Sequence, residues 1–310
     1  MTTEPSTLAA SQPIAVIGAT GTQGLAVLTA LLATAHPVRA LTRSPHKLAG
    51  LAAAHANLAV VETDIGDPGS LSFGFLGAWA LFVNTRSDYA LPAGSEEALL
   101  RGIVDAARES EVRWLVMSVL PEGVPARAYE EKARAMRYAR EVAVKGRIEP
   151  IFVQMGWYMS GFSGYMKPVV HSVDGVTEFR WSTITPDTLF PLVDSADLGL
   201  VVRAILDSPE EWADVEVPVV GDVLTIPQVA RIYSEVTGQP ARAVFVDHVP
   251  QESIPQWVAR HSAYRDAGYF PKYVGRESEI PTLARKLVPE MKSFAEWLKQ
   301  SGFVASAGDA

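Results

Sequence analysis

Three glycines near the start of the chain have the spacing that a phosphate-binding turn requires. The segment runs Gly18-Ala19-Thr20-Gly21-Thr22-Gln23-Gly24, directly after an apolar run and directly before an apolar helical pattern. A pyrophosphate needs backbone N–H groups at a helix N-terminus and no side chains that block its approach. Glycines also occur in ordinary tight turns, but the strand before and the helix after favour a dinucleotide site. The residues that we expect to bind the cofactor here are Gly18, Thr20, Gly21, Thr22, Gln23 and Gly24.

The residues after the second apolar run bear on the choice of cofactor. An acidic residue at this place binds the ribose 2′-hydroxyl of NAD, whereas a basic residue accommodates the 2′-phosphate of NADP. The sequence has Arg43 here and Lys47 one turn further on, with no carboxylate in reach. A guanidinium matches phosphate geometry, although an arginine in this place can also be a solvated surface residue. We predict NADP(H).

Elements of two kinds alternate in the first half of the chain. Short apolar or β-branched runs predict strands at Ile14–Gly18, Val38–Thr42, Leu58–Glu62, Ala78–Val83, Trp114–Ser118 and Ile151–Gln154. Helical patterns lie between them at Gln23–Thr34, Pro45–Ala54, Pro68–Leu76, Gly94–Ser110 and Ala128–Lys145. Because strands that alternate with helices pair in parallel through right-handed crossovers, the fold class is α/β with a doubly wound parallel Rossmann sheet.

The regular alternation of strand and helix patterns ends in the second half of the chain. Glycines, aromatics and prolines dominate from Gly156 to Pro191 and predict an irregular segment. Helices are expected at Ser195–Leu206 with Ser195 or Asp194 as cap, from Thr225 to near Gly238, and at Met291–Gln300 closed by Gly302, with a strand at Val244–Val246. The expected organisation is a tail (1–12), a Rossmann core (13–155), a smaller substrate-side lobe (156–303) and a second tail (304–310).

Composition excludes several function classes. The 310 residues carry a net charge of −8 without a basic cluster, which argues against direct nucleic-acid binding. The absence of cysteine excludes disulfides and thiolate catalysis, and the six histidines lack the paired spacing of a metal site. Neither a leader peptide nor a membrane span is predicted. We expect a cytoplasmic protein without a metal, of open oligomeric state.

The chain resembles the atypical short-chain dehydrogenases of the NmrA-like and isoflavone-reductase-like families. The resemblance runs from end to end, through GATGTQG (18–24), VRALTRSP (38–45), LFVNTRS (81–87), GWYMSGF (156–162), PLVDSADLG (191–199), GDVLTIPQVARIYSEVTG (221–238) and MKSFAEWLKQSGF (291–303). It implies that Arg43 contacts the 2′-phosphate. It also implies that Asp64 and Ile65 lie at the adenine, and that Asn84 and Thr85 lie at the ribose and nicotinamide, although all four could be ordinary loop residues.

The resemblance also directs attention to Lys132. Typical short-chain dehydrogenases carry Tyr-x-x-x-Lys on a helix and a Ser at the end of the preceding strand. Here Ser118 ends a predicted strand and Tyr129 precedes Lys132 by three residues, one short of that spacing. Residues three apart on a helix still lie only about 60° apart around its axis. The predicted catalytic residues are therefore Lys132, at the nicotinamide, with Tyr129 and Ser118. Family members without the tyrosine leave Tyr129 open as a packing residue.

An aromatic segment follows the last predicted strand of the core. Trp157, Tyr158, Met159 and Phe162 are predicted to line a substrate pocket for a flat apolar ligand, or alternatively to fill an interface. Two functions follow. The first is an NADP(H)-dependent oxidoreductase that reduces a small carbonyl or enone in secondary metabolism, aromatic compounds included. The alternative is an NADP(H)-sensing regulator that binds a protein partner, and a fold alone cannot separate the two.

Overall fold

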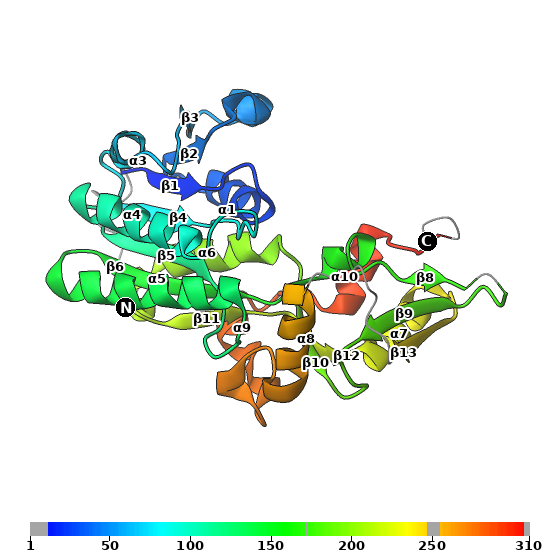
Figure 1. The fold of residues 1–310 in the computed structure, drawn as a ribbon. Helices are drawn as coiled ribbons and strands as arrows, with labels where there is room; N and C mark the ends of the chain where they lie inside the picture. Colours follow the sequence, from blue (N-terminus) through cyan, green and yellow to red (C-terminus); the bar gives the residue numbers. More distant parts are fainter. Residues whose placement is uncertain (1–11, 172, 247–254, 307–310) are drawn as a thin grey trace. The chain divides into compact units, whose positions relative to one another are not determined.

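A seven-stranded sheet has the order β11-β6-β5-β4-β1-β2-β3 (Figure 1). The computed structural model describes residues 12–171, 173–246 and 255–306, with the backbone alone for 255–259. Neighbouring strands from β3 to β6 pair in parallel, which confirms the predicted doubly wound Rossmann sheet. The strands are β1 (Ile14–Ile17), β2 (Val38–Thr42), β3 (Leu58–Glu62), β4 (Ala80–Val83), β5 (Trp114–Val119), β6 (Glu149–Met155) and β11 (Glu216–Val219).

Helices follow these strands and bury both faces of the sheet. The helical elements are α1 (Thr22–Leu32), η2 (Pro45–Leu48), α2 (Ala49–Ala54), α3 (Pro68–Phe75), α4 (Ser95–Glu109), α5 (Arg127–Lys145), α6 (Asp197–Asp207) and η4 (Pro209–Trp212). Ala15 and Ile17 of β1 share a buried cluster with α3, α4 and α5. Ile14 and Val16 point to the opposite face, because side chains alternate along a strand, and they are equally buried.

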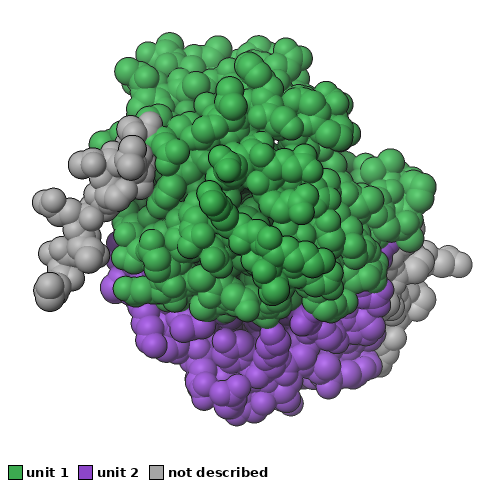
Figure 2. All heavy atoms as spheres, turned by 90° about the vertical axis from the view of Figure 1, so that its left-hand side faces the viewer, with its two compact units in different colours: residues 1–120, 131–154, 198–217 green, residues 121–130, 155–197, 218–310 purple. Residues whose placement is uncertain are grey.

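The chain forms two compact units, coloured green and purple in Figure 2. Unit 1 comprises residues 1–120, 131–154 and 198–217, and unit 2 comprises residues 121–130, 155–197 and 218–310. The predicted boundary after residue 155 lies beside one point where the chain passes between the units. The division expected from the sequence placed residues 121–130 in the Rossmann core and residues 198–217 in the substrate-side lobe. In the structure, residues 121–130 belong to unit 2 and residues 198–217 to unit 1.

Unit 2 contains two further sheets, with the strand orders β12-β10-β7 and β13-β9-β8. The segment predicted to be irregular therefore contains short strands, a correction that follows from their length: two of them have only two residues, too few for a recognisable alternation. The elements of this half are β7 (Trp157–Tyr158), η3 (Met159–Ser163), β8 (Val169–Val170), β9 (Thr177–Ser182), β10 (Leu189–Val193), β12 (Asp222–Thr225), α7 (Ile226–Thr237), β13 (Ala241–Val246), α8 (Pro255–Ala267), η5 (Pro271–Tyr273), η6 (Glu277–Glu279), α9 (Thr282–Leu287) and α10 (Phe294–Ser301).

The predicted caps of unit 2 are confirmed. Thr225 forms a capping box with Gln228 at the start of α7, and Gly238 ends that helix with a φ of 71°. Gly302 likewise ends α10 with a φ of 63°, in the left-handed region that glycine favours. The last helix begins at Phe294 and not at Met291, because Ser293 caps it. Ser195 or Asp194 was expected to cap a helix from Ser195, but α6 begins at Asp197, and the carboxylates of Asp194 and Asp197 both contact the Lys292 ammonium at 2.9 Å.

Candidate functional site

The glycine-rich turn joins β1 to α1 within unit 1. Gly18 has a φ of +75°, and a Cβ on it would lie 2.8 Å from the carbonyl oxygen of Asn84. A Cβ on Gly24 would lie 2.1 Å from the carbonyl oxygen of Gly18. Both positions therefore need glycine, the first for its backbone conformation and both for the close approach of neighbouring backbone.

The N-terminus of α1 is suited to an anion. Its N-cap, Gly21, provides no side chain, and no acidic residue lies in its first turn. The positive end of the helix dipole is thus left without compensation from its own helix, while Thr20, Gly21 and Thr22 are exposed. Gln23 is buried. These residues fit a pyrophosphate, whose charge the first-turn N–H groups would bind.

The turn lies at the switch point of the sheet. β1 is flanked by β2 on one side and β4 on the other, so successive connections turn in opposite directions from it. In open α/β sheets, ligands bind outside the carboxyl ends of the strands at such a point. Gly18 follows β1, and Asn84 and Thr85 follow β4. The close approach of Gly18 to Asn84 brings these two segments together.

The predicted 2′-phosphate residues lie at the end of β2. Arg43 and Lys47 are exposed, and the Ser44 N–H donates to Thr42 Oγ1 at 3.1 Å, which shapes the turn between strand and η2. Past β3, Asp64 is exposed and accepts the Gly66 N–H at 3.0 Å, whereas Ile65 is half-buried against the core of unit 1.

Lys132 is a buried cation with a buried counter-ion. Its side chain extends from α5, and the residue is 5% exposed. Its Nζ lies 2.8 Å from Glu96 Oε1, and it donates to the Thr85 carbonyl at 3.3 Å and to Thr85 Oγ1 at 3.2 Å. Thr85 and Ser87 donate their hydroxyls to the same Glu96 carboxylate. The structure thus brings two predicted site residues, Thr85 and Lys132, into direct contact, and both also contact Glu96, which was not predicted.

The electrostatic balance keeps Glu96 ionised. Burial alone raises the pKa of the Glu96 carboxyl, but the Lys132 ammonium and the hydroxyls of Ser87 and Thr85 outweigh it, and the net pKa is lowered. The group is therefore a carboxylate at neutral pH.

Glu131, the residue before Lys132, contacts the start of α4. Its carboxylate accepts the N–H groups of Gly94 at 3.0 Å, Glu96 at 2.9 Å and Glu97 at 3.3 Å. Glu131 of α5 thus caps the N-terminus of α4, and it is 1% exposed. Two adjacent residues of α5 therefore contact the first turn of α4: Glu131 accepts its backbone N–H groups, and Lys132 pairs with the Glu96 side chain.

The predicted tyrosine belongs to unit 2. Tyr129 is 3% exposed, its hydroxyl forms a hydrogen bond with that of Tyr264, and its ring packs edge-on against Tyr264 and Tyr269. Burial, then the neighbouring Tyr264, raises the pKa of Tyr129 well above its ordinary value, so the phenol keeps its proton. Lys132 contacts Glu96 and Thr85 of unit 1, so the two side chains have different partners. Ser118 is buried in β5.

The predicted pocket residues lie among other aromatics of unit 2. Trp157 is 6% exposed and packs against Trp181, Phe190 and Tyr264 at centroid distances of 6.0, 5.6 and 5.7 Å. Met159 and Phe162 are buried and Tyr158 is half-buried. Phe162 packs against two core rings, those of Phe179 and Phe294.

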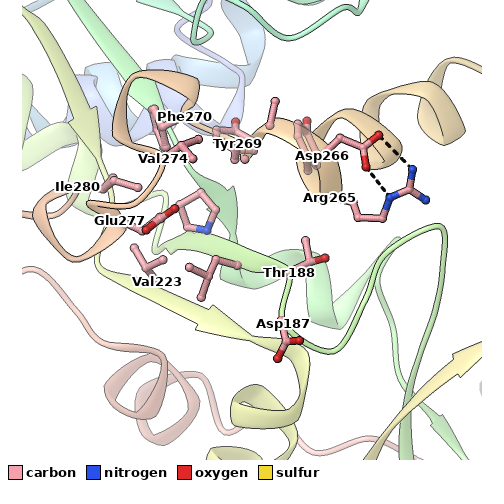
Figure 3. Close-up of a pocket in the computed structure, with 15 residues that line it drawn as sticks. Asp187, Thr188, Val223, Arg265, Asp266, Tyr269, Phe270, Val274, Glu277 and Ile280 are labelled. Atoms are coloured by element: carbon pink, nitrogen blue, oxygen red, sulfur yellow. Dashed lines mark hydrogen bonds and ion pairs between the residues drawn. The ribbon is translucent and has the colours of Figure 1, made fainter.

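A cavity of about 170 Å³ opens elsewhere in unit 2 (Figure 3). Its wall includes Tyr264 and Tyr269, and the ion pair of Arg265 with Asp266 lies at its side. Three carboxylates against one guanidinium make the lining acidic; they belong to Asp187, Asp266 and Glu277. The four predicted pocket residues are not among those that line it.

The chain belongs to the NmrA-like family, whose model matches residues 10–298. The NmrA-like family domain-containing oxidoreductase notA of Aspergillus sp. is 32% identical over 256 residues, which cover 74% of this chain and 75% of the relative. The prediction of the family is thereby confirmed.

Solved structures share the fold. NmrA, a negative transcriptional regulator, superimposes with a TM-score of 0.79 at 23% identity over 94% of this chain and 95% of its own. The triphenylmethane reductase of Citrobacter sp., complexed with NADP(H), has a TM-score of 0.72 at 20% identity, covering 94% of this chain and 99% of its own. NmrA has been crystallised with NAD and with NADP, which agrees with the predicted cofactor.

Sequence reasoning missed Glu96, Glu131 and the cavity. Two adjacent acids in the first turn of a helix ordinarily compensate its dipole, so the sequence does not indicate that Glu96 has a further partner. The partners Glu96 and Lys132 lie 36 positions apart, and no spacing rule joins them. The cavity is lined largely by the segment from α8 to η6, whose apolar residues do not gather on one helical face. Among the residues described, no cluster of three metal-ligating side chains occurs, and no helix has the length and apolarity to cross a membrane.

Proposed function

We propose that this chain is an NADP(H)-dependent reductase of small carbonyl or enone compounds, including aromatic secondary metabolites. The observation that carries the proposal is the buried ammonium of Lys132, 2.8 Å from Glu96 and beside Thr85 after β4. Buried charges are costly unless they are paired. Groups with a perturbed pKa gather at functional sites, and Glu96 is one, since against the effect of burial the Lys132 ammonium lowers its pKa. A protein that only senses a dinucleotide does not need an ionised lysine at this edge of the sheet.

Each group in unit 1 has a role in this proposal. The glycine-rich turn and the first turn of α1 hold the pyrophosphate, and Arg43 with Lys47 binds the 2′-phosphate. NADPH, when bound, supplies a hydride to the carbonyl carbon or to the β-carbon of the enone. Lys132 orients the nicotinamide ribose and donates a proton to the oxygen that becomes negative. We assign Tyr129 to packing, because its hydroxyl is engaged by Tyr264.

The names of similar proteins support a reductase. The relative notA is called an oxidoreductase, and the triphenylmethane reductase acts on an aromatic compound, as its name states. The second name is consistent with a substrate that is aromatic and largely apolar. The aromatic segment and the cavity of unit 2 are the two candidates for its binding place.

The regulatory alternative has one observation in its favour. Trp157 and Phe162, predicted to face a substrate, are buried against other rings of unit 2. A filled aromatic cluster suits a protein whose dinucleotide changes an interface rather than reacts, and NmrA is named a transcriptional regulator. In this alternative, the same residues bind NADP(H), and the affinity for a protein partner depends on whether the cofactor site is occupied.

The test is transfer of a labelled hydride. NADPH carrying deuterium at the transferable position is mixed with the protein and a panel of aromatic ketones, enones and quinones. We expect one deuterium in the product for each NADPH oxidised. NADPH that binds but is not oxidised by any compound of the panel would reject the reductase and leave the regulator.

A further inference from the structure

We propose that Glu96 is the positioning residue of the reductase: it fixes the Lys132 ammonium beside Thr85 and keeps it there when a ligand occupies the site. The inference rests on the proposed function, because it assigns Lys132 the task of contacting the ligand. Glu96 itself acts only through Lys132.

The Lys132 ammonium makes three polar contacts with the protein. An ammonium has three N–H donors, and the protein offers three acceptors: Glu96 Oε1 at 2.8 Å, Thr85 Oγ1 at 3.2 Å and the Thr85 carbonyl at 3.3 Å. A ligand hydroxyl can bind Lys132 only if one of these is released. The two contacts with Thr85 are the longer ones and carry no full charge, so they are released more easily. The contact with Glu96 then holds the ammonium in place.

Glu96 is itself held in place by hydrogen bonds. Its Oε1 accepts the Thr85 hydroxyl at 2.6 Å, and its Oε2 accepts the Ser87 hydroxyl. Its backbone N–H is bound by Glu131 at 2.9 Å. A carboxylate held at both oxygens and at its own backbone has one available orientation, and Lys132 receives that orientation through the ion pair.

Contacts other than the pair of Glu96 and Lys132 attach α4 to α5. The start of α4 is already bound to α5 by the Glu131 carboxylate, which accepts three N–H groups, and by the pair of Glu97 with Arg134. A buried ion pair contributes little net stability, and apolar residues of similar volume often replace one without loss. The pair of Glu96 and Lys132 is therefore not needed to attach these helices, which leaves positioning of the ammonium as its function.

The test compares Glu96→Gln with Glu97→Gln. Both remove one carboxylate from the first turn of α4 that pairs with a cation of α5, but only Glu96 contacts Lys132. In protein labelled with ¹⁵N-lysine and free of cofactor, a buried, ion-paired ammonium exchanges its protons slowly and gives its own signal, which is assigned by its loss in Lys132→Met. We expect Glu96→Gln to abolish this signal at neutral pH and Glu97→Gln to retain it. NADPH should shift the signal in the wild type without removing it.

Turnover is the second readout. Glu96→Gln should lower kcat by about 10²-fold, because misplacing a reacting group by about 1 Å has that effect. The dissociation constant of NADPH should stay within about threefold, since the phosphate contacts are made elsewhere. Glu96→Asp should recover part of kcat, and Glu97→Gln should turn over like the wild type.

The outcomes separate this inference from the proposed function. An unchanged ammonium signal in Glu96→Gln, or equal losses of kcat in both glutamine variants, overturns the positioning role. A wild type that oxidises no NADPH overturns the reductase, while the ammonium signal of the cofactor-free protein still shows whether Glu96 fixes Lys132.

Discussion

Three charged side chains are buried inside the described part of unit 1, where a charge is costly unless it has a partner. Lys132, Glu96 and Glu131 are 5%, 7% and 1% exposed, yet each has a charged or hydrogen-bonding partner. Removing one partner of such a pair leaves an uncompensated buried charge, at a cost of about 3–5 kcal/mol. Lys132 could be predicted because a family pattern contains it. Its partner could not, because the contact depends on how α4 and α5 pack and not on local sequence.

Arg43 is the residue on which the cofactor prediction depends. The exposed guanidinium at the end of β2 is expected to bind the 2′-phosphate that NADPH has and NADH lacks. Arg43→Ala should weaken NADPH binding by about 1–3 kcal/mol, the range of a charge-assisted hydrogen bond, and leave NADH nearly unchanged. Calorimetric titration of both cofactors measures this. A wild type that binds NADH as tightly as NADPH would reject the preference.

The turn from β1 into α1 is the element that we expect to bind the phosphates of the cofactor. Gly21 has an extended backbone conformation, φ −90° and ψ 168°, which any residue can adopt, and a Cβ on it would lie 3.3 Å from the Gly18 carbonyl oxygen. Gly21→Val should therefore fold, with a cost of about 1 kcal/mol for a poorer N-cap. Its side chain would obstruct the pyrophosphate, so NADPH affinity should fall beyond detection in the same titration.

Gly50→Ala is the control, because a Cβ at Gly50 meets no atom within 4 Å and the substitution lies in α2. It should bind NADPH like the wild type and be slightly more stable. If the folded Gly21→Val variant binds NADPH normally, the phosphates lie elsewhere.

The elements of unit 1 were predicted more fully than those of unit 2. β2 and β3 have the predicted bounds, and α5 starts one residue early, because apolar runs between helical patterns are clear in one sequence. β11 was missed, although it adds a seventh strand to the main sheet, because its run is only four residues long and contains Pro218, which cannot donate a backbone hydrogen bond to a neighbouring strand. α8 was missed because its polar and apolar residues are mixed around the helix.

At the scale of the whole molecule, the candidate chemistry is divided between two units. Unit 1 holds the glycine-rich turn, Arg43 and Lys132, and unit 2 holds the aromatic cluster and the cavity. The first set could be predicted because strand ends and glycines follow general rules of Rossmann sheets. The second could not, since the aromatic residues meet only after β7, β10 and α8 have packed.

His261 makes the stability of the molecule depend on pH. Burial in the aromatic cluster, then the charge of Arg260, lowers the pKa of His261 from 6.5 to about 4. The folded state therefore holds this histidine neutral between those values, whereas the unfolded chain takes up a proton. Stability should fall as the pH drops through this window, by about 2 kcal/mol from pH 7 to pH 5.

His261→Phe removes the titrating group and keeps an aromatic ring in contact with Trp157 and Trp181. Its free energy of unfolding in urea should change less between pH 7 and pH 5 than that of the wild type. His46→Gln, a change at an exposed histidine, should keep the wild-type dependence. Identical pH profiles for His261→Phe and the wild type would show that the ring is not held neutral by burial.

The participation of Lys132 in reduction by NADPH is tested most directly by measuring the turnover of Lys132→Ala together with its affinity for NADPH. With a substrate that the wild type reduces, we expect kcat to fall by roughly 10²–10⁴-fold, the contribution of a positioned acid–base group. NADPH should still bind, because its phosphates are expected to contact the glycine-rich turn and Arg43, and Tyr129→Phe should reduce the substrate nearly as the wild type does. Wild-type turnover in Lys132→Ala, with NADPH bound normally, would contradict the account.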